Sequence, residues 1–232
     1  MTTIAERLSA VSQRIKAAAQ DAGRNPDSVT LLAVSKRKPL KDIEAALALG
    51  LRAFGENYVR EGVEKIQGLA QSRPGHGAQW HYIGPIQSNK TAPIAEHFDW
   101  VQSLDRAKLA QRLNDQRPSH LNPLQICIQV NISGESSKSG LAPEEVETLA
   151  ALVASLPHLE LRGLMAIPKA TDDQEEQHRQ FAAMKALFDR LKEKHPQIDT
   201  LSMGMSGDLE AAIMEGATMV RLGTALFGTR TD

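Results

Sequence analysis

The residue best placed for covalent chemistry is a lysine at the junction of an apolar run and a basic segment. Lys36 follows Leu31-Leu32-Ala33-Val34-Ser35 and precedes Arg37 and Lys38. The apolar run predicts a short buried strand that ends on the lysine. Partial burial among other cations favours the neutral amine, and a neutral amine can form an imine with an aldehyde. The alternative is that Lys36 begins a solvated basic loop.

Two turns near the end of the chain combine glycine with a hydroxyl side chain. They are Gly204-Met205-Ser206-Gly207-Asp208 and Arg221-Leu222-Gly223-Thr224. Each precedes a predicted helix, so backbone N–H groups and the positive end of the helix can converge on an anion. Either turn alone is typical of an ordinary loop. Together they predict a phosphate site.

A phosphate-bearing aldehyde that reacts with a lysine is either pyridoxal phosphate or a sugar phosphate in an aldolase-like reaction. Arg221 helps to separate these two. From the end of its strand, it could face the pyridine nitrogen of a bound cofactor. Because a guanidinium only donates hydrogen bonds, that nitrogen would stay unprotonated and the ring would be a weak electron sink. The alternative for Arg221 is a salt bridge at the mouth of the fold.

The elements that position these residues alternate along the whole chain. Thr3 and Glu6 form a capping box for a first helix that starts near Ile4 and ends near Gly23. After it, short apolar segments predict eight strands, each followed by a helical pattern, at residues 31–36, 52–54, 80–83, 100–103, 124–130, 159–165, 200–203 and 218–221.

Eight strand–helix units predict an α/β fold with a parallel sheet, and in 232 residues they favour one closed (β/α)8 TIM barrel with an extra N-terminal helix. We expect residues 1–232 to form a single domain. In such barrels the active face is built from the loops after the strands, and phosphate is often held after strands seven and eight. Strand eight closes beside strand one, so Lys36 and the two turns should be neighbours.

Composition excludes several classes of protein. The 27 lysines and arginines nearly balance the 28 aspartates and glutamates, which gives no electrostatic reason to expect a nucleic acid partner. No apolar stretch is long enough to span a membrane, so we expect a cytoplasmic protein. The single cysteine, Cys127, lies in an apolar run and is expected in the core. The seven histidines have no recognised metal-ligand spacing, so no metal site is expected.

A family resemblance rests on six segments in order along the chain. They are Ala33-Val34-Ser35-Lys36, Phe54-Gly55-Glu56-Asn57, His81-Tyr82-Ile83-Gly84 with Gln87-Ser88-Asn89-Lys90, Ser136-Ser137-Lys138-Ser139-Gly140, Met205-Ser206-Gly207-Asp208 and Arg221-Leu222-Gly223-Thr224. Together they resemble the pyridoxal phosphate homeostasis protein family, which is similar to the N-terminal barrel of alanine racemase.

The resemblance implies a barrel that binds pyridoxal 5'-phosphate. Lys36 would carry the cofactor as a Schiff base, and Arg221 would face the ring nitrogen. Asn57 would lie beside the cofactor. The phosphate would be held by Ser206, Gly207, Gly223 and Thr224. The loop at residues 133–140, which contains Lys138, is expected either to close over the cofactor or to remain solvated.

Racemisation needs two bases on opposite faces of the α-carbon, and a related fold supplies one as a tyrosine from a second, β-rich domain. We expect no such domain here, and the only tyrosines are Tyr58 and Tyr82, both within the predicted barrel. The resemblance implies a non-catalytic carrier or regulator of the intracellular vitamin B6 pool, with effects on amino and keto acid balance. Apoenzymes that use the cofactor are possible recipients, and we expect a monomer. The alternative is a racemase of low activity that uses Lys36 and a surrogate base such as His81.

Overall fold

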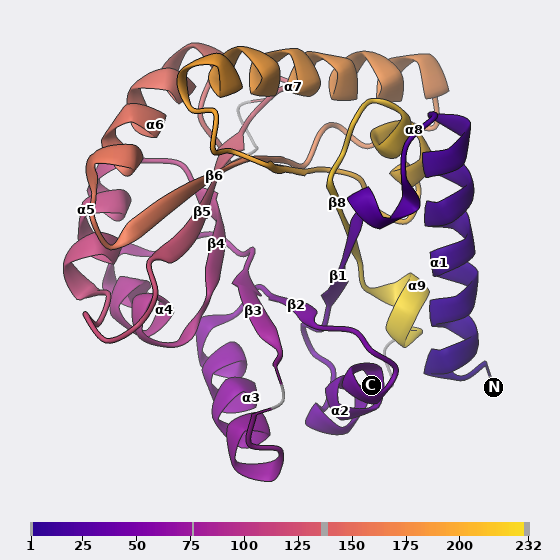
Figure 1. Cartoon of the computed structure of the whole chain (residues 1–232), viewed down its shortest axis with the longest axis horizontal. Coiled ribbons are helices and arrows are strands. Elements are labelled where there is room, and N and C mark those ends of the chain that lie inside the picture. The colour runs from indigo at the N-terminus through magenta and orange to yellow at the C-terminus, as the bar shows by residue number, and fades with distance from the viewer. Residues whose placement is uncertain (1, 76, 136–138, 230–232) are drawn as a thin grey trace.

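The chain folds as a closed barrel of eight parallel strands in the order β1 to β8 (Figure 1). The structure is a computed structural model that describes residues 2–75, 77–135 and 139–229. The strands are β1 (Thr30–Val34), β2 (Ala53–Glu56), β3 (Gln79–Tyr82), β4 (Trp100–Leu104), β5 (Leu124–Val130), β6 (Leu159–Ala166), β7 (Thr200–Ser202) and β8 (Met219–Leu222).

Helices surround the barrel, as Figure 1 shows. They are α1 (Ile4–Asp21), α2 (Leu40–Ala48), α3 (Val59–Ser72), α4 (Thr91–His97), α5 (Ala107–Gln116), α6 (Val146–Ser155), α7 (Gln174–Lys194), α8 (Leu209–Met214) and α9 (Thr224–Phe227). Single 3-10 turns precede β1, α4 and α6, at η1 (Pro26–Ser28), η2 (Ser88–Lys90) and η3 (Pro143–Glu145).

The predicted barrel is confirmed, while the bounds of every strand but β5 differ from the predicted ones by one or two residues. The shift that concerns the site is at the first strand. β1 ends at Val34 and not at Lys36 as predicted. Ser35 still donates its N–H to Gly55 O at 2.9 Å, but the chain then turns, and Arg37 takes the left-handed conformation with φ of 58°. Lys36 therefore lies in a turn just after the strand.

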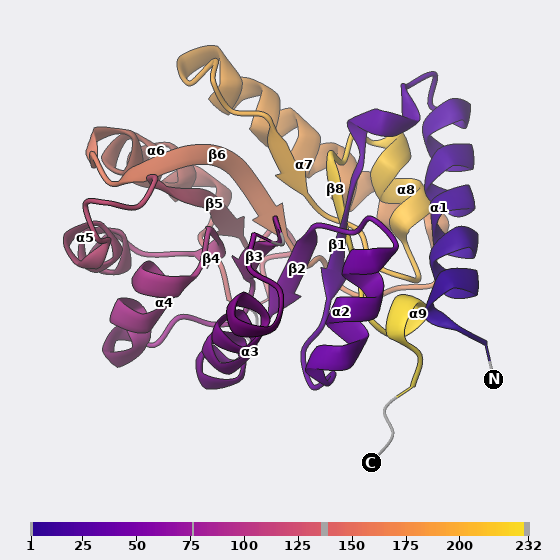
Figure 2. The same ribbon diagram turned by 60° about the horizontal axis from the view of Figure 1, so that its bottom comes forward.

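Helix α1 packs on the outside of the barrel against α8 and α9, and Figure 2 shows the three helices together on one side. The predicted capping box is present, since Thr3 Oγ1 accepts the Glu6 N–H at 3.2 Å and Glu6 accepts the Thr3 N–H at 2.7 Å. Val11 and Ile15 are buried on its inner face. The extra helix thus covers the short α8.

Cys127 is fully buried beside Trp100 and Met165, and burial raises the pKa of its thiol, as expected of a core residue. Within the described ranges, no helix is long and apolar enough to cross a membrane. The same ranges contain no group of histidine, cysteine and carboxylate side chains that could hold a metal ion.

Candidate functional site

Strand pairing brings the predicted site segments to one end of the barrel. Leu32 pairs with Arg221 and Ala33 with Leu222, which places the end of β1 beside the turn after β8. A Cβ built on Gly223 would lie only 3.2 Å from Val34 O. On the other side, Val34 of β1 pairs with Gly55 of β2. The turns after β8, β1 and β2 are therefore neighbours.

Lys36 lies partly buried in the turn after β1. Its neighbours in the sequence are all held: Ser35 and Arg37 form hydrogen bonds to other segments, and Lys38 Nζ donates to Gly228 O at 2.9 Å. The Lys36 amine itself has neither a hydrogen bond nor an ion pair with any described residue. This arrangement leaves the amine available to a bound molecule.

Asn57 follows β2, and its side-chain oxygen is a buried acceptor that lacks a partner among the described residues. Its backbone is held closely, because a Cβ on Gly84 would lie 2.1 Å from Asn57 O. Gly84 O in turn accepts the Ser103 hydroxyl at 2.6 Å. An unpaired buried acceptor is unfavourable by roughly 1–3 kcal/mol, so the Asn57 amide is suited to meet a donor on a ligand.

The two glycine–hydroxyl turns lie side by side, since Arg221 N–H donates to Gly204 O at 3.0 Å. Ser206, Gly207 and Thr224 are exposed, and a Cβ on Gly207 would meet no atom within 4 Å. The turn after β7 is closed by Asp208, whose carboxylate accepts the Met205 N–H at 2.6 Å. The hydroxyls and backbone of both turns are thus accessible to an anion.

Arg221 is only 4% exposed and is held by neutral oxygens rather than by a carboxylate. Its Nη1 donates to Ser202 Oγ and its Nη2 to Ala166 O, both at 2.8 Å. Within the described part of the chain it forms no ion pair, so the alternative of a salt bridge is not observed. Burial lowers the pKa of Arg221 to about 10, which keeps the guanidinium charged at neutral pH.

A polar chain continues from Arg221 across the barrel interior. Ser202 Oγ donates to Gln102 Oε1 at 2.7 Å, and Gln102 Nε2 lies 2.9 Å from His81 Nδ1. Because the amide oxygen is already an acceptor, its nitrogen donates and His81 Nδ1 accepts. Burial lowers the pKa of His81 to about 3, and the ring stacks on Trp100 at 4.9 Å. His81 is therefore a neutral core residue.

The sequence singled out neither Gln102 nor Ser202, although both are polar residues inside strands that are otherwise apolar. That pattern was the available signal, since polar side chains inside a barrel must pair with one another. Lys65, on α3, was also missed. It lies on the buried stripe of this helix with Gly62 and Leu69, where a lysine is unusual.

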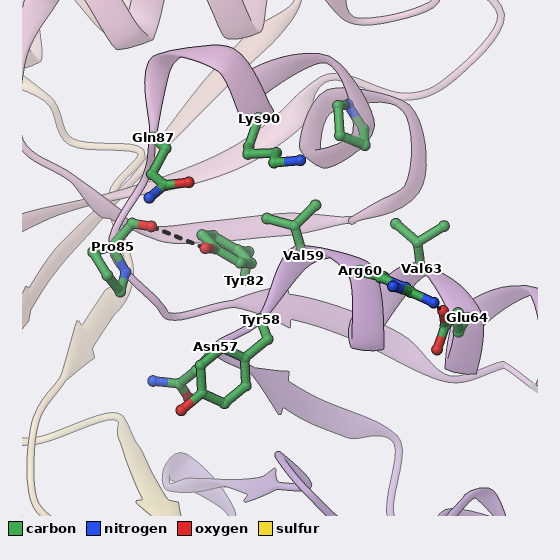
Figure 3. Close-up of a pocket in the computed structure, with 11 residues that line it drawn as sticks. Asn57, Tyr58, Val59, Arg60, Val63, Glu64, Tyr82, Pro85, Gln87 and Lys90 are labelled. Atoms are coloured by element: carbon green, nitrogen blue, oxygen red, sulfur yellow. Dashed lines mark hydrogen bonds and ion pairs between the residues drawn. The ribbon is translucent and has the colours of Figure 1, made fainter.

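A cavity of about 750 Å³ adjoins the site through Asn57, between α3 and the segment after β3 (Figure 3). Tyr82 lines it and donates its hydroxyl to Pro85 O at 2.9 Å, and burial raises the pKa of Tyr82 to about 12. Tyr58, at the rim, is 46% exposed and accepts a hydrogen bond from Arg37 Nη2 at 3.2 Å. Neither tyrosine is arranged as a base.

The predicted loop at residues 133–140 is described only in part, because Ser136, Ser137 and Lys138 lie outside the described residues. Two of its other residues accept hydrogen bonds from the segment before the loop: Glu135 O accepts from Asn131 Nδ2 at 2.8 Å, and Ser139 O accepts from Gln129 Nε2 at 3.3 Å.

Comparison with known proteins adds to this geometry. The family described as alanine racemase, N-terminal domain, matches residues 7–231. The chain is 58% identical to the pyridoxal phosphate homeostasis protein of Pseudomonas aeruginosa, over 99% of this chain and 97% of that protein. It is 55% identical to the protein of the same name from Vibrio alginolyticus, over 99% of both chains.

Among solved structures, PipY of Synechococcus elongatus with pyridoxal phosphate bound is 36% identical. The two align with a TM-score of 0.82 over 97% of this chain and 100% of PipY. The chain therefore belongs to the pyridoxal phosphate homeostasis protein family, within the wider family of the alanine racemase N-terminal domain.

Proposed function

We propose that this protein binds pyridoxal 5'-phosphate covalently through Lys36 and acts in the cytoplasm as a carrier or regulator of the vitamin B6 pool. The observation that carries the proposal is the unpaired Lys36 amine at the barrel end that also holds the Asn57 acceptor and the two glycine–hydroxyl turns. The bound cofactor in PipY and the name of the relatives support the same ligand.

Each predicted residue has a role in this proposal. The phosphate is held by the exposed hydroxyls and backbone N–H groups of Ser206, Gly207, Gly223 and Thr224. Asn57 binds a polar group beside the ring, and Arg221 directs its remaining donors to the ring nitrogen. The cofactor supplies an aldehyde that condenses with a neutral amine and releases water.

The surroundings of Arg221 favour a holding role over catalysis. Ser202 and Ala166 hold the guanidinium, and burial does not bring its pKa near neutrality. An arginine so held cannot accept a proton from the ring nitrogen or supply one readily. A ring with an unprotonated nitrogen draws electrons weakly, so bonds at the α-carbon of an amino acid are little activated.

Racemisation would need a second base. Among the described side chains we consider His81 and Tyr82 for it, and both are poorly suited. His81 stays neutral while its Nδ1 accepts from Gln102. Tyr82 donates its hydroxyl to Pro85 O, and its pKa is raised to about 12. These contacts support the non-catalytic proposal.

Titration of the cofactor-free protein with pyridoxal phosphate tests the proposal by absorbance. The wild type should show the band of the lysine-bound cofactor at one equivalent per chain. Lys36→Ala should lack that band, while Lys41→Ala, which removes an exposed lysine close by in the sequence, should retain it. A normal band in Lys36→Ala would refute attachment at Lys36.

The low-activity racemase remains a second candidate because the barrel of alanine racemase from Corynebacterium glutamicum has the same fold, with a TM-score of 0.70 at 18% identity. Single-enantiomer amino acids incubated with the loaded protein in heavy water would show it. We expect no steady loss of optical activity. A loss that disappears in Lys36→Ala would establish the racemase instead.

A carrier should also pass its cofactor to recipient apoenzymes and thereby influence amino and keto acid balance. We expect the loaded protein to activate an apoenzyme faster than free cofactor does when a scavenger of free pyridoxal phosphate is present. Activation that the scavenger abolishes would show release into solution instead of delivery.

A further inference from the structure

A buried cluster of charged side chains lies beneath the turn that carries Lys36. At its centre is Lys65, which is 8% exposed and lies on α3. Its Nζ donates to Ser35 O at 2.7 Å, to Glu56 Oε1 at 2.8 Å and to Glu61 Oε1 at 2.6 Å. Ser35 belongs to the turn after β1, Glu56 is the last residue of β2, and Glu61 lies on α3 itself.

The cluster holds the chain on both sides of Lys36. On the side before Lys36, the Ser35 carbonyl oxygen accepts a hydrogen bond from Lys65, and the Ser35 hydroxyl donates to Glu56 Oε1 at 2.6 Å. After it, the Arg37 N–H donates to Glu61 Oε1. Arg37 has a φ of 58°, a conformation that a residue with a side chain adopts only when its surroundings hold it there.

A contribution to folding stability does not by itself explain why these charged side chains are buried together. Glu56 is fully buried, burial raises the pKa of its carboxyl, and its Oε2 has no partner among the described residues. Removing charges from water is unfavourable, and buried ion pairs are often replaced by apolar residues without loss of stability. What the cluster does hold is one turn, and that turn presents Lys36.

We propose that Lys65, together with Glu56 and Glu61, positions the Lys36 amine for bond formation with the aldehyde of pyridoxal phosphate. This inference rests on the proposed function. In the step concerned, the Lys36 nitrogen bonds to the aldehyde carbon, two protons leave the nitrogen and the aldehyde oxygen departs as water. The reaction needs the amine to approach that carbon along a defined direction.

A positioning role separates covalent capture from binding. The phosphate turns lie after β7 and β8 and make no hydrogen bond with Lys65, so a variant at Lys65 should still bind the cofactor. Its Lys36 amine should react less completely, because even a small displacement of a reacting group reduces its reactivity, here by an expected factor of about ten. Global destabilisation would lower binding and capture in proportion.

The test uses Lys65→Met, which keeps the aliphatic stem and removes the donors. Total bound cofactor is measured by equilibrium dialysis, and cofactor linked to Lys36 by borohydride reduction and peptide mass spectrometry. We expect the linked fraction of bound cofactor to fall about tenfold. Lys185→Met is the matched control, since Lys185 also pairs with a carboxylate one helical turn away, Asp189, but on the exposed face of α7. Its linked fraction should equal that of the wild type.

If Lys65→Met does not fold, Glu61→Ala is the second test variant. Glu61 is partly exposed, and its contact with the turn is the hydrogen bond that it accepts from the Arg37 N–H, after Lys36. Its control is Glu147→Ala, which removes a carboxylate from an exposed pair with Lys194. A linked fraction that stays at the wild-type value in a folded Lys65 or Glu61 variant would overturn the positioning role alone. Absence of label on Lys36 in the wild type would instead overturn the proposed function.

Discussion

Three charged side chains near the barrel mouth are held in three different ways, and the differences suit different tasks. Lys36 has no partner among the described residues, and Lys65 has three oxygen partners. Arg221 is buried against neutral oxygens. A free amine can react, a fully paired ammonium can hold a backbone, and a guanidinium fixed in place can only orient what it contacts.

At the residue scale, the histidine of the interior chain should make stability depend on pH. Folded His81 has a pKa of about 3, against 6.5 for an ordinary histidine. As the pH falls below 6.5, the unfolded chain binds a proton that the folded chain does not, so the free energy of unfolding falls. The expected loss between pH 6.5 and 5 is roughly 2 kcal/mol.

Urea unfolding at pH 7 and pH 5 measures this effect. The same pair of measurements on His81→Gln, whose side chain does not titrate, should show a smaller fall by about that amount. A fall of the same size in wild type and variant would show that His81 is not the group responsible.

Gly84 gives a second prediction at this scale. A methyl group there would lie 2.1 Å from Asn57 O, so Gly84→Ala must displace the segment after β2. We expect a loss of at least about 2 kcal/mol in the free energy of unfolding. Gly207→Ala, where the space is open, should change it by less than about 1 kcal/mol. Equal thermal and urea stability of both variants would contradict the close packing of Gly84 on Asn57.

At the scale of elements, the alternation of strand and helix was predictable because each unit carries its own pattern. β5 has the predicted bounds, Leu124–Val130, since its apolar run is long and is interrupted only by Gln125 and Gln129. β1 ends earlier than predicted, because Ser35 and Arg37, on either side of Lys36, are held by contacts with β2 and α3 that no local pattern contains. The placement of Lys36 among segments far apart in sequence was predictable only through the barrel.

The Lys65 cluster shows what sequence reasoning could not supply. A helix with Glu61, Glu64 and Lys65 has the composition of a solvated surface, and only the position of Lys65 between Gly62 and Leu69 indicates burial. Its partners lie on β1's turn and on β2, so the cluster exists only after three elements pack together.

Helix α1 should contribute to the phosphate turn through Arg14. Its Nη2 donates to Ser206 O at 3.0 Å, and its Nε pairs with Glu210 at 2.7 Å. We therefore expect Arg14→Met to weaken binding of pyridoxal phosphate about threefold to tenfold, the equivalent of roughly one ordinary hydrogen bond.

Lys16→Met is the control for this prediction, since Lys16 is an exposed cation of the same helix. Its dissociation constant in an equilibrium titration should match that of the wild type. If Arg14→Met also binds normally, α1 covers α8 without shaping the phosphate turn.

At the scale of the whole molecule, the closed barrel leaves no strand edge open for pairing. The large apolar side chains that remain exposed in the described ranges lie on separate segments, namely Leu49, Tyr58, Ile167, Met205 and Met214. Five such residues, each on its own segment, are a small apolar area compared with the interface that a stable dimer buries.

We accordingly predict a monomer. Size-exclusion chromatography with light scattering should give a mass near 25.3 kDa, that of one chain, at all loading concentrations. A mass that doubles with concentration, or that doubles when the cofactor is added, would show a dimer that this surface does not explain.

The central claim concerns one bond, between Lys36 and pyridoxal phosphate, and mass spectrometry after borohydride reduction tests it most directly. Reduction makes the labile bond permanent, and peptide mapping then locates it. We predict one pyridoxyl phosphate group per chain, on the peptide that contains Lys36. A label on another lysine, or no label on a protein loaded with the cofactor, would contradict the assigned site.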